Sequence, residues 1–480
     1  MDTPTDYRFR NHARNFIFDF EPGVRARIEV VGAPRYHGLA MESGDLIYDW
    51  NVHQATGYLK PSQKLEFDDE TLRDGLQSPS VTLPPVSERI RILHLIDALG
   101  IDTADLGLPG AGGKVKAETL ELAKEIVRSK LRVTANCAAR TLEVDVRPIA
   151  EIQQAAGIPV EACLFIGSSP IRRYAEDWTM DQMLEHTRKS ISFAVKEGLT
   201  VMYVTEDTTR AQPEDLRKLY LTAIECGAKR LCLADTVGHV NPNGVFQLVT
   251  WVKKLLREAG REDVKIDFHG HMDRGLGVWN AISAFMAGTN RVHGTAIGIG
   301  ERVGNAPMDQ ILVNLKLLGW IDNDLSKLDE YCRTVSKAVE VPIPNNYPVI
   351  GKDAFETATG VHASAVIKAM KKGDRWLADR VYSGVPASWV GRAQSVRVGP
   401  LSGRSNIVYW LEQRGLPATD EVVNAIFEQA KASPRLLSDE EMERTGGRIL
   451  GVKGNGSRKK EKKGKGRVGT KSRGGPRARK

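Results

Sequence analysis

Long apolar runs and paired cysteines are missing from this 480-residue chain, and each absence excludes a class of protein. No hydrophobic stretch reaches the roughly 20 residues of a membrane-spanning helix, so we expect no membrane segment. The N-terminal sequence MDTPTDYRFRNHARNF lacks an apolar signal core, which argues against secretion by that route. The five cysteines are odd in number and form no CxxC pair, which argues against a disulfide framework or a zinc ribbon. We therefore expect a cytoplasmic, reduced protein.

Basic residues are unevenly distributed along the chain. Residues 453–480 hold 13 Lys and Arg against one Glu, a net charge of +12 within a total of +8, which leaves −4 for the other 452 residues. This segment is rich in glycine and nearly free of apolar residues, which predicts a disordered basic tail at 451–480. Such a tail could contact nucleic acid weakly through sequence-independent charge. A solvated tail with no defined partner is the simpler interpretation.

Eight short apolar or β-branched segments recur from residue 64 onward, and stretches with helical spacing separate them. The segments are 64–69, 102–108, 131–136, 160–166, 200–205, 230–235, 264–269 and 291–297. This alternation predicts an α/β fold, a (β/α)₈ TIM barrel of roughly 250 residues. A doubly wound open sheet is the alternative. It would require a glycine fingerprint after the first strand, where this chain has TLRDGLQ.

The predicted barrel occupies residues 61–320, between two further parts of the chain. Residues 1–60 form an N-terminal extension with short β-like pieces, RARIEVV and DLIYDW. Residues 321–450 are expected to form a C-terminal helical subdomain, in which helical spacing marks 325–339 and 421–432.

Polar side chains follow nearly every predicted strand. Because TIM barrels form their active sites at the C-terminal ends of the strands, we expect these side chains to converge on one site. They are Arg73, Asp74, Asp105, Asn136, Arg140, Ser168, Ser169, Glu206, Asp207, Asp235, Thr236, His269, His271, Glu301, Arg302 and Asn305.

His269 and His271 are two residues apart on a predicted strand, so their side chains point to the same face. An HxH pair alone is more often two ordinary histidines. Barrel closure, however, brings Asp74 after the first strand next to Asn305 after the last strand. Together the four could bind a divalent metal and leave positions open for water and a chelating 2-oxo acid. Mg²⁺, Mn²⁺ and Zn²⁺ are all compatible with these ligands.

Three further features have both a functional and a structural interpretation. Arg73 could stabilise developing enolate or alkoxide charge beside the metal, or it could form a structural salt bridge. Glu206 could act as a general base, or it could pair with Arg210. The loop GIGERVGN at 298–305 could cradle an anion with its backbone amides, or it could be only a tight turn.

Several motifs resemble the family of 2-isopropylmalate synthase, homocitrate synthase and HMG-CoA lyase. The matching segments are DETLRDGLQSP (69–79), LGLP (106–109), TEDTTR (205–210), LADTVG (233–238), HGHMDRGLG (269–277), GIGERVGN (298–305) and, beyond the barrel, TGVHASAVIK, VYSGVPASWVGR and GPLSGRSN. The resemblance implies a metal-dependent TIM-barrel enzyme that joins acetyl-CoA to a 2-oxo acid by a Claisen-type condensation and then hydrolyses the thioester. It also implies a homodimer.

The resemblance assigns roles to residues by their places in these motifs. For the metal they are Asp74, His269, His271 and Asn305; for catalysis Arg73, Glu206, His362 and Tyr382; and for substrate binding Gln77, Arg140, Met202 and Thr236. Arg73 would polarise the carbonyl, and Thr236 would contact the 2-oxo acid. Glu206, His362 and Tyr382 would form the acid–base group, with His362 supplied by a partner subunit.

Departures from the family motifs bear on the substrate. Met202 stands four residues before Glu206, where homocitrate synthases carry an arginine, and this apolar position favours a 2-isopropylmalate synthase with 2-oxoisovalerate as acceptor. Ile299 stands in the loop where the lyases carry a cysteine. Leu76 and Met272 replace a glutamate and an asparagine of the family, which leaves the metal ligands in place and leaves the acceptor substrate open. A homocitrate- or citramalate-type synthase and a C–C lyase are the alternatives, and a non-catalytic paralogue with a nucleic-acid-binding tail differs from them in kind.

Overall fold

The computed structural model describes residues 19–20, 24–25, 46–47 and 60–450, in two compact units, Met1–Leu59 and Lys60–Lys480. In the first unit, β1 (Asp19–Phe20) pairs antiparallel with β2 (Val24–Arg25). Of the two β-like pieces named above, at 25–31 and 45–50, the structure describes only residues 25, 46 and 47. The basic tail at 451–480 lies wholly outside the described residues.

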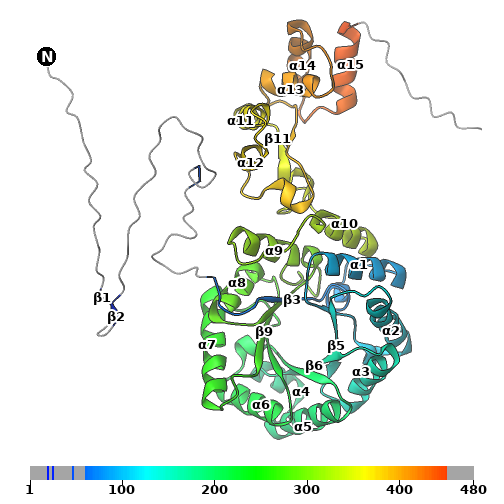
Figure 1. The fold of residues 1–480 in the computed structure, drawn as a ribbon, viewed down its shortest axis with the longest axis vertical. Helices are drawn as coiled ribbons and strands as arrows, with labels where there is room; N and C mark the ends of the chain where they lie inside the picture. The colour runs from blue at the N-terminus through cyan, green and yellow to red at the C-terminus, as the bar shows by residue number, and fades with distance from the viewer. Residues whose placement is uncertain (1–18, 21–23, 26–45, 48–59, 451–480) are drawn as a thin grey trace, which may run out of the picture. The chain divides into compact units, whose positions relative to one another are not determined.

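Eight parallel strands close into a barrel in the second unit (Figure 1). Their chain order is also their order around the barrel, and β10 pairs with both β9 and β3 to complete the ring. The strands are β3 (Glu66–Asp69), β4 (Thr103–Asp105), β5 (Thr134–Arg140), β6 (Val160–Gly167), β7 (Thr200–Glu206), β8 (Arg230–Asp235), β9 (Lys265–Gly270) and β10 (Arg291–Gly294). The predicted (β/α)₈ barrel is therefore confirmed, and the open sheet is excluded.

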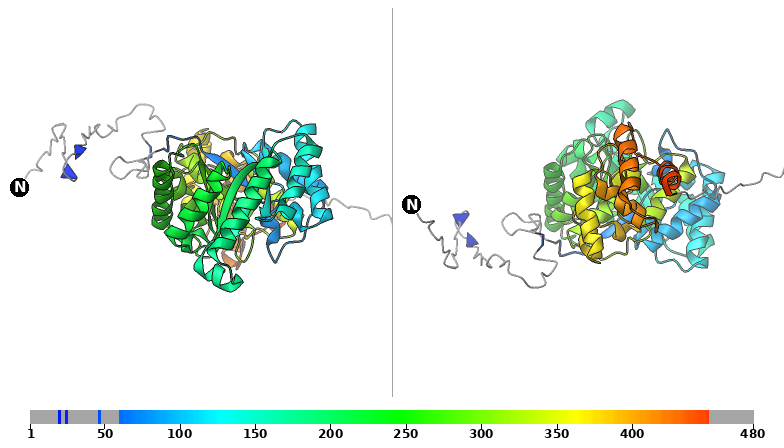
Figure 2. Two further views of the ribbon diagram at one scale, coloured as in Figure 1. Left: turned by 90° about the horizontal axis from the view of Figure 1, so that it is seen from below. Right: turned by 90° about the horizontal axis from the view of Figure 1, so that it is seen from above.

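Helices follow the strands and surround the barrel on its outside, as two further views also show (Figures 1 and 2). They are α1 (Val86–Ala98), α2 (Gly113–Arg128), α3 (Glu143–Ala156), α4 (Pro170–Glu176), α5 (Met180–Lys196), α6 (Pro213–Glu225), α7 (Pro242–Glu258), α8 (Gly277–Ala287) and α9 (Met308–Leu317). Short 3₁₀ turns lie in the loops, among them η2 (Gly75–Gln77), η3 (Pro109–Ala111), η4 (Thr208–Arg210) and η5 (Ala296–Gly298). Within the described residues, no helix is long and apolar enough to cross a membrane.

Helix α6 illustrates why these segments are helical. Pro213 occupies its first turn, where no intrahelical N–H is needed, and Glu214 follows near the positive end of the helix dipole. Leu216, Leu219 and Ala223 recur at helical spacing and are buried in the main core. The sequence period therefore determines which face of α6 packs on the barrel.

A network of ion pairs fills the barrel at the N-terminal ends of its strands. Arg291 donates to Asp267 at 2.7 Å and to Glu161 at 2.5 Å, and Arg230 donates to Asp267 at 2.5 Å and to Glu66 at 3.0 Å. Because Glu66, Arg230 and Arg291 each begin a strand, this network lies at the end of the barrel opposite the predicted active site.

The chain continues beyond the barrel in helices, as predicted. Helix α10 (Leu328–Val339) packs on α1, and it covers the predicted stretch 325–339 except for its first three residues. The later elements are η6 (Lys352–Phe355), β11 (Glu356–Thr357), α11 (Gly360–Lys371), α12 (Arg375–Ala378), η7 (Ala387–Val390), β12 (Ser395–Val396), α13 (Arg404–Glu412), α14 (Asp420–Ala432) and α15 (Asp439–Leu450). Helices α13 to α15 share a small apolar core of their own.

Candidate metal centre and active site

A cavity of about 260 Å³ opens at the C-terminal ends of the barrel strands. Ten of the residues singled out from the sequence line it: Arg73, Asp74, Gln77, Met202, Glu206, Thr236, His269, His271, Glu301 and Arg302. They come from five different strands or from the loops directly after them. The barrel thus brings together side chains that are far apart in sequence, such as Arg73 and Arg302.

The four expected metal ligands meet at one edge of this cavity. Asp74 Oδ2 lies 3.8 Å from His269 Nε2 and 3.7 Å from His271 Nε2, and Asn305 Nδ2 lies 2.6 Å from the same carboxylate oxygen. A backbone bridge between His271 and Asn305 holds the loop after β10 against β9. One potential ligand atom from each of Asp74, His269 and His271 lies within 4.8 Å of the others.

The polar atoms around these ligands fit a divalent cation. Asn305 Oδ1 is buried and has no hydrogen-bond partner within the described part of the chain. Rotating the amide by 180° turns this oxygen toward Asp74, because the two ends of an amide have the same shape. One carboxylate, two imidazoles and one amide oxygen form a donor set that Mg²⁺, Mn²⁺ and Zn²⁺ accept.

The two histidines have opposite electrostatic surroundings. Burial and the neighbouring charge of His269 lower the pKa of His271 to about 4, so its ring is neutral and offers a lone pair. Burial also lowers the pKa of His269, but the charge and hydrogen bond of Glu70 outweigh it, and the net pKa is raised. Glu70 accepts from His269 Nδ1 at 2.7 Å, which leaves Nε2 facing Asp74.

Arg73 is held in the cavity wall by three carboxylates. It donates to Asp105 at 2.6 Å, to Asp74 at 2.9 Å and to Glu70 at 3.1 Å. Burial raises the pKa of Asp105 to about 7, and the charge of Arg73 opposes that rise. Arg73 therefore forms a structural salt bridge and also lines the cavity, so its two interpretations describe one arrangement.

Glu206 ends β7 and faces the cavity without a close ion pair. Its nearest cation is Arg172 at 4.0 Å, whereas Arg210 pairs with Asp207 at 2.7 Å, so the alternative pairing of Glu206 with Arg210 does not form. Burial raises the pKa of Glu206, and the charge of Arg172 opposes that rise. A carboxylate of raised pKa in a cavity is suited to accept a proton.

The loop 298–305 is folded tightly on itself and anchored by its arginine. Gly304 donates its N–H to the carbonyl of Glu301 at 2.8 Å, and Asn305 donates to the carbonyl of Gly298 at 3.1 Å. Arg302 binds Asp273 through two hydrogen bonds of 2.8 and 2.9 Å. These backbone amides are used within the loop, which places Glu301 and Arg302 in the cavity lining and Asn305 beside Asp74.

The wall of the cavity beside Glu206 is apolar and rich in sulfur. Cys163, Met202 and Cys232 form a small cluster across β6, β7 and β8, with Val204 packed against it. Beneath it, Arg291 lies 3.3 Å from the sulfur of Met202. Because Arg291 is bound by carboxylates, this wall presents no unpaired cation to a substrate.

The comparisons with known proteins match the part of the chain that forms the barrel. The family model described as HMGL-like matches residues 64–335. This chain belongs to the HMGL-like family. Relatives of this member include a putative (R)-citramalate synthase CimA of Methanopyrus kandleri, 33% identical over 79% of this chain and 71% of its own length. A homocitrate synthase AksA of the same organism is 31% identical over 76% and 86% of the two chains.

Further matches to this HMGL-like chain come from another organism and from a solved structure. A 2-isopropylmalate synthase of Sulfolobus acidocaldarius is 30% identical over 77% of this chain and 91% of its own. A crystal structure of the HMG-CoA lyase from Brucella melitensis matches with a TM-score of 0.49 and 17% identity, over 58% of this chain and all of the other.

Eight of the expected strand-end residues do not line the cavity of this HMGL-like barrel, and neither do His362 and Tyr382. The eight are Asp105, Asn136, Arg140, Ser168, Ser169, Asp207, Asp235 and Asn305. Arg140 is exposed and binds Asp145 at the start of α3, at 2.5 and 3.0 Å. His362 on α11 and Tyr382 after α12 are also exposed, and their rings stack with centroids 4.2 Å apart. Their catalytic and substrate-binding roles stay predictions.

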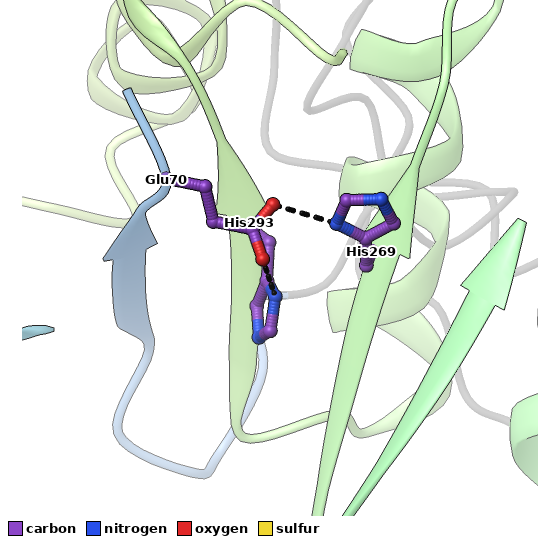
Figure 3. Close-up of side chains that lie close together, drawn as sticks. All are labelled: Glu70, His269 and His293. Atoms are coloured by element: carbon purple, nitrogen blue, oxygen red, sulfur yellow. Dashed lines mark hydrogen bonds and ion pairs between the residues drawn. The ribbon is translucent and has the colours of Figure 1, made fainter. Parts of the chain in front are cut away.

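Sequence reasoning assigned no role to two residues at the floor of the site, Glu70 and His293. Both are buried and line the cavity, and Glu70 lies between His269 and His293 (Figure 3). The available signal was a histidine in the eighth strand and a glutamate directly after the first strand. Only the pairing of β10 with β3 makes these two neighbours.

Proposed function

We propose that this protein condenses acetyl-CoA with a 2-oxo acid and hydrolyses the thioester, with 2-oxoisovalerate as acceptor and 2-isopropylmalate as product. The observation that carries the proposal is that Asp74, His269 and His271 lie together beside Arg73, in a cavity that Glu206 also lines. Relatives named as synthases of this type at 30 to 33% identity support it. The product would enter leucine biosynthesis, and the expected location is the cytoplasm.

The metal site would hold the 2-oxo acid. Asp74, His269, His271 and Asn305 would bind a divalent metal, which supplies Lewis-acid polarisation of the keto group when bound. Arg73 adds a fixed positive charge at the same edge of the cavity. Because three carboxylates hold Arg73 in place, it stabilises negative charge on the keto oxygen without moving.

The proton transfers are assigned to Glu206, His362 and Tyr382. Glu206 would take a methyl proton from acetyl-CoA, because it lines the cavity and burial raises its pKa, with Arg172 opposing. His362 and Tyr382 are stacked on each other and exposed, so they are available to enter the site of a second copy of the chain. This homodimer belongs to the proposal. Gln77 and Thr236, which line the cavity, would contact the substrates.

The apolar wall supports 2-oxoisovalerate over 2-oxoglutarate. Met202 and Val204 offer contact to a branched aliphatic side chain. A second carboxylate would need a cation there, and the arginine behind Met202 is already bound to Glu161 and Asp267. Pyruvate is the second candidate acceptor, because relatives named (R)-citramalate synthase are among the matches. The remaining alternatives to 2-isopropylmalate synthesis are a homocitrate-type synthase and an HMG-CoA-lyase-like C–C cleavage.

Release of free CoA thiol tests the proposal directly. Purified protein is incubated with acetyl-CoA, Mg²⁺ or Mn²⁺, and 2-oxoisovalerate, pyruvate, 2-oxoglutarate or oxaloacetate in turn. We expect metal-dependent thiol release with 2-oxoisovalerate and its loss in Asp74→Asn. Thiol release with pyruvate alone would show that pyruvate, and not 2-oxoisovalerate, is the acceptor. If none of the four acids gave thiol release although the protein still bound Mn²⁺, the proposed synthase activity would be contradicted.

A further inference from the structure

Glu70 connects a metal-binding histidine to a second, deeper histidine (Figure 3). One carboxylate oxygen accepts from His269 Nδ1 at 2.7 Å, and the other accepts from His293 Nδ1 at 3.0 Å. The first of these contacts occupies the ring nitrogen of His269 that faces away from Asp74. The side chains of Glu70 and His293 are only 5% and 1% exposed, so water does not compete for these hydrogen bonds.

His293 is oriented from behind by the ion network of the barrel. Its second nitrogen, Nε2, lies 3.0 Å from Asp267, and Asp267 is itself bound by Arg230 and Arg291. Both ring nitrogens of His293 thus face carboxylate oxygens, which only accept hydrogen bonds when ionised. A ring that donates from both nitrogens has no lone pair left for a metal.

This geometry decides between two arrangements of the histidines. Glu70, His269 and His293 are close enough together to resemble a metal-binding group. Because both nitrogens of His293 are engaged with carboxylates, that group does not form a second metal site. It is a chain of hydrogen bonds that leads from the ion network at the N-terminal end of the barrel to His269.

We propose that Glu70 and His293 act as a positioning pair that keeps the proton of His269 on Nδ1 and directs its Nε2 lone pair toward the metal beside Asp74. This inference rests on the proposed function, since it assigns the metal centre of that reaction. His293 holds Glu70 in place, and Glu70 holds the ring of His269. A further hydrogen bond, from Arg73 to Glu70 at 3.1 Å, ties the carbonyl-polarising residue to the same carboxylate.

The test measures Mn²⁺ binding to the full-length, metal-stripped protein, in the absence of acetyl-CoA and any 2-oxo acid. Glu70→Gln keeps the size of the side chain and removes its charge, and we expect roughly 10- to 100-fold weaker Mn²⁺ binding. His293→Gln should weaken binding in the same direction, because Glu70 loses the group that orients it. Glu70→Asp keeps the charge and should recover part of the affinity.

Glu66→Gln is the matched control. Glu66 lies four residues earlier in the chain and binds Arg230 and Lys265 in the same ion network, but it has no contact with either histidine. It should lower the unfolding temperature of the metal-free protein while its Mn²⁺ affinity stays within twofold of wild type. If Glu70→Gln and His293→Gln also bind Mn²⁺ within twofold of wild type, the positioning pair is refuted.

Two further readouts keep the inference testable if a variant folds poorly. In the double variant Glu70→Gln/His293→Gln, Mn²⁺ should bind no more weakly than in the weaker single variant, because the two residues act as one unit, and additive losses would contradict this. In the wild-type protein, ¹⁵N NMR of the His269 ring, assigned with His269→Gln, should show the proton on Nδ1. A proton on Nε2 would overturn the proposal. Neither result depends on which 2-oxo acid is the acceptor.

Discussion

Asp309 is a fully buried carboxyl at the start of α9, away from the metal ligands. One oxygen accepts from the backbone N–H of Ile297 at 2.8 Å, and the other has no hydrogen-bond partner within the described residues. Burial, together with the charge of Asp69, raises the pKa of Asp309 to about 7. The folded protein therefore binds this proton more tightly than the unfolded chain, in which the pKa is about 3.9.

We predict that Asp309→Asn changes the pH dependence of stability. Between about pH 4 and pH 7 the wild-type carboxyl is protonated when folded and ionised when unfolded, so the free energy of unfolding falls as pH rises through this range. The amide removes that contribution. The variant should thus gain stability relative to wild type from pH 5 to pH 8, at about 1.4 kcal/mol per pKa unit at most. Urea unfolding at pH 5 and pH 8 measures the free energy of unfolding of the variant and of wild type, with the exposed Asp322→Asn as control. If the difference between Asp309→Asn and wild type were the same at both pH values, the prediction would be contradicted.

Glu206 should govern the acidic limb of the reaction rate. As a general base it must be ionised, so activity is lost as pH falls through its pKa, which burial raises above the ordinary glutamate value while Arg172 opposes. Glu206→Gln should lower kcat by roughly 10²- to 10⁴-fold and leave Mn²⁺ binding unchanged. Arg172→Gln removes the opposing charge and should move the limb to higher pH. A pH profile of thiol release measures both effects, and a limb unmoved in Arg172→Gln would exclude Glu206 as the base.

At the scale of elements, the loop after β10 depends on backbone that only glycine can supply. Gly304 has a φ of +94°, and a Cβ atom there would collide with the carbonyl of Gly298 across the loop. Its own carbonyl accepts from the N–H of Met272, which joins this loop to the one that follows β9. Asn305 comes next in the chain, so the path of this loop sets the position of the fourth ligand.

Gly304→Ala should therefore damage the metal centre, and Gly319→Ala provides the matched control. Gly319 also has a positive φ, +68°, but its Cβ would meet open space. We expect Gly319→Ala to cost about 1 kcal/mol of stability from backbone strain alone, with normal Mn²⁺ binding. Gly304→Ala should weaken Mn²⁺ binding more than tenfold. Calorimetric titration and thermal unfolding compare the two variants, and equal Mn²⁺ affinities would show that the loop path does not matter.

At the scale of the whole molecule, Arg392 joins the helical region to the segment that leaves the barrel. It donates to four successive backbone carbonyls at 349–352, with distances of 2.6 to 3.5 Å, and its Nε lies 3.7 Å from Asp329 on α10. Val349 has a φ of +67°, which is rare for a β-branched residue. The arginine fork holds this strained turn in place.

Arg392→Lys should loosen this connection and leave the barrel intact. A lysine ammonium lacks the planar fork that reaches four carbonyls, so three partly buried carbonyls, at 349–351, lose a partner, at up to about 1–3 kcal/mol each. We expect faster limited proteolysis between residues 340 and 355, with Mn²⁺ affinity unchanged. Arg414→Lys, at a site that binds Asp439 within the helical region, is the control. Cleavage at the wild-type rate in Arg392→Lys would contradict the prediction.

The eight strands and three of the candidate metal ligands were predictable from local sequence patterns, for different reasons. The eight strands were predictable because each is a short apolar segment between helical periods, although β5 covers 134–140 rather than 131–136. In its C-terminal half, Cys137, Ala138 and Ala139 are small residues, which do not by themselves indicate a strand. His269 and His271 were predictable because their spacing alone places them on one face of a strand, and Asp74 follows once the barrel is assumed to close.

By itself, then, the sequence determined the barrel, the polar strand ends and the group of Asp74, His269 and His271, because all of these depend on spacing along the chain. Only the tertiary structure decided that Glu70 lies between His269 and His293, since β3, β9 and β10 must pair in register to bring these residues together. It also decided that Arg140 binds Asp145 outside the cavity. Side-chain contacts across the barrel depend on strand register, and register is a property of the closed sheet rather than of any one segment.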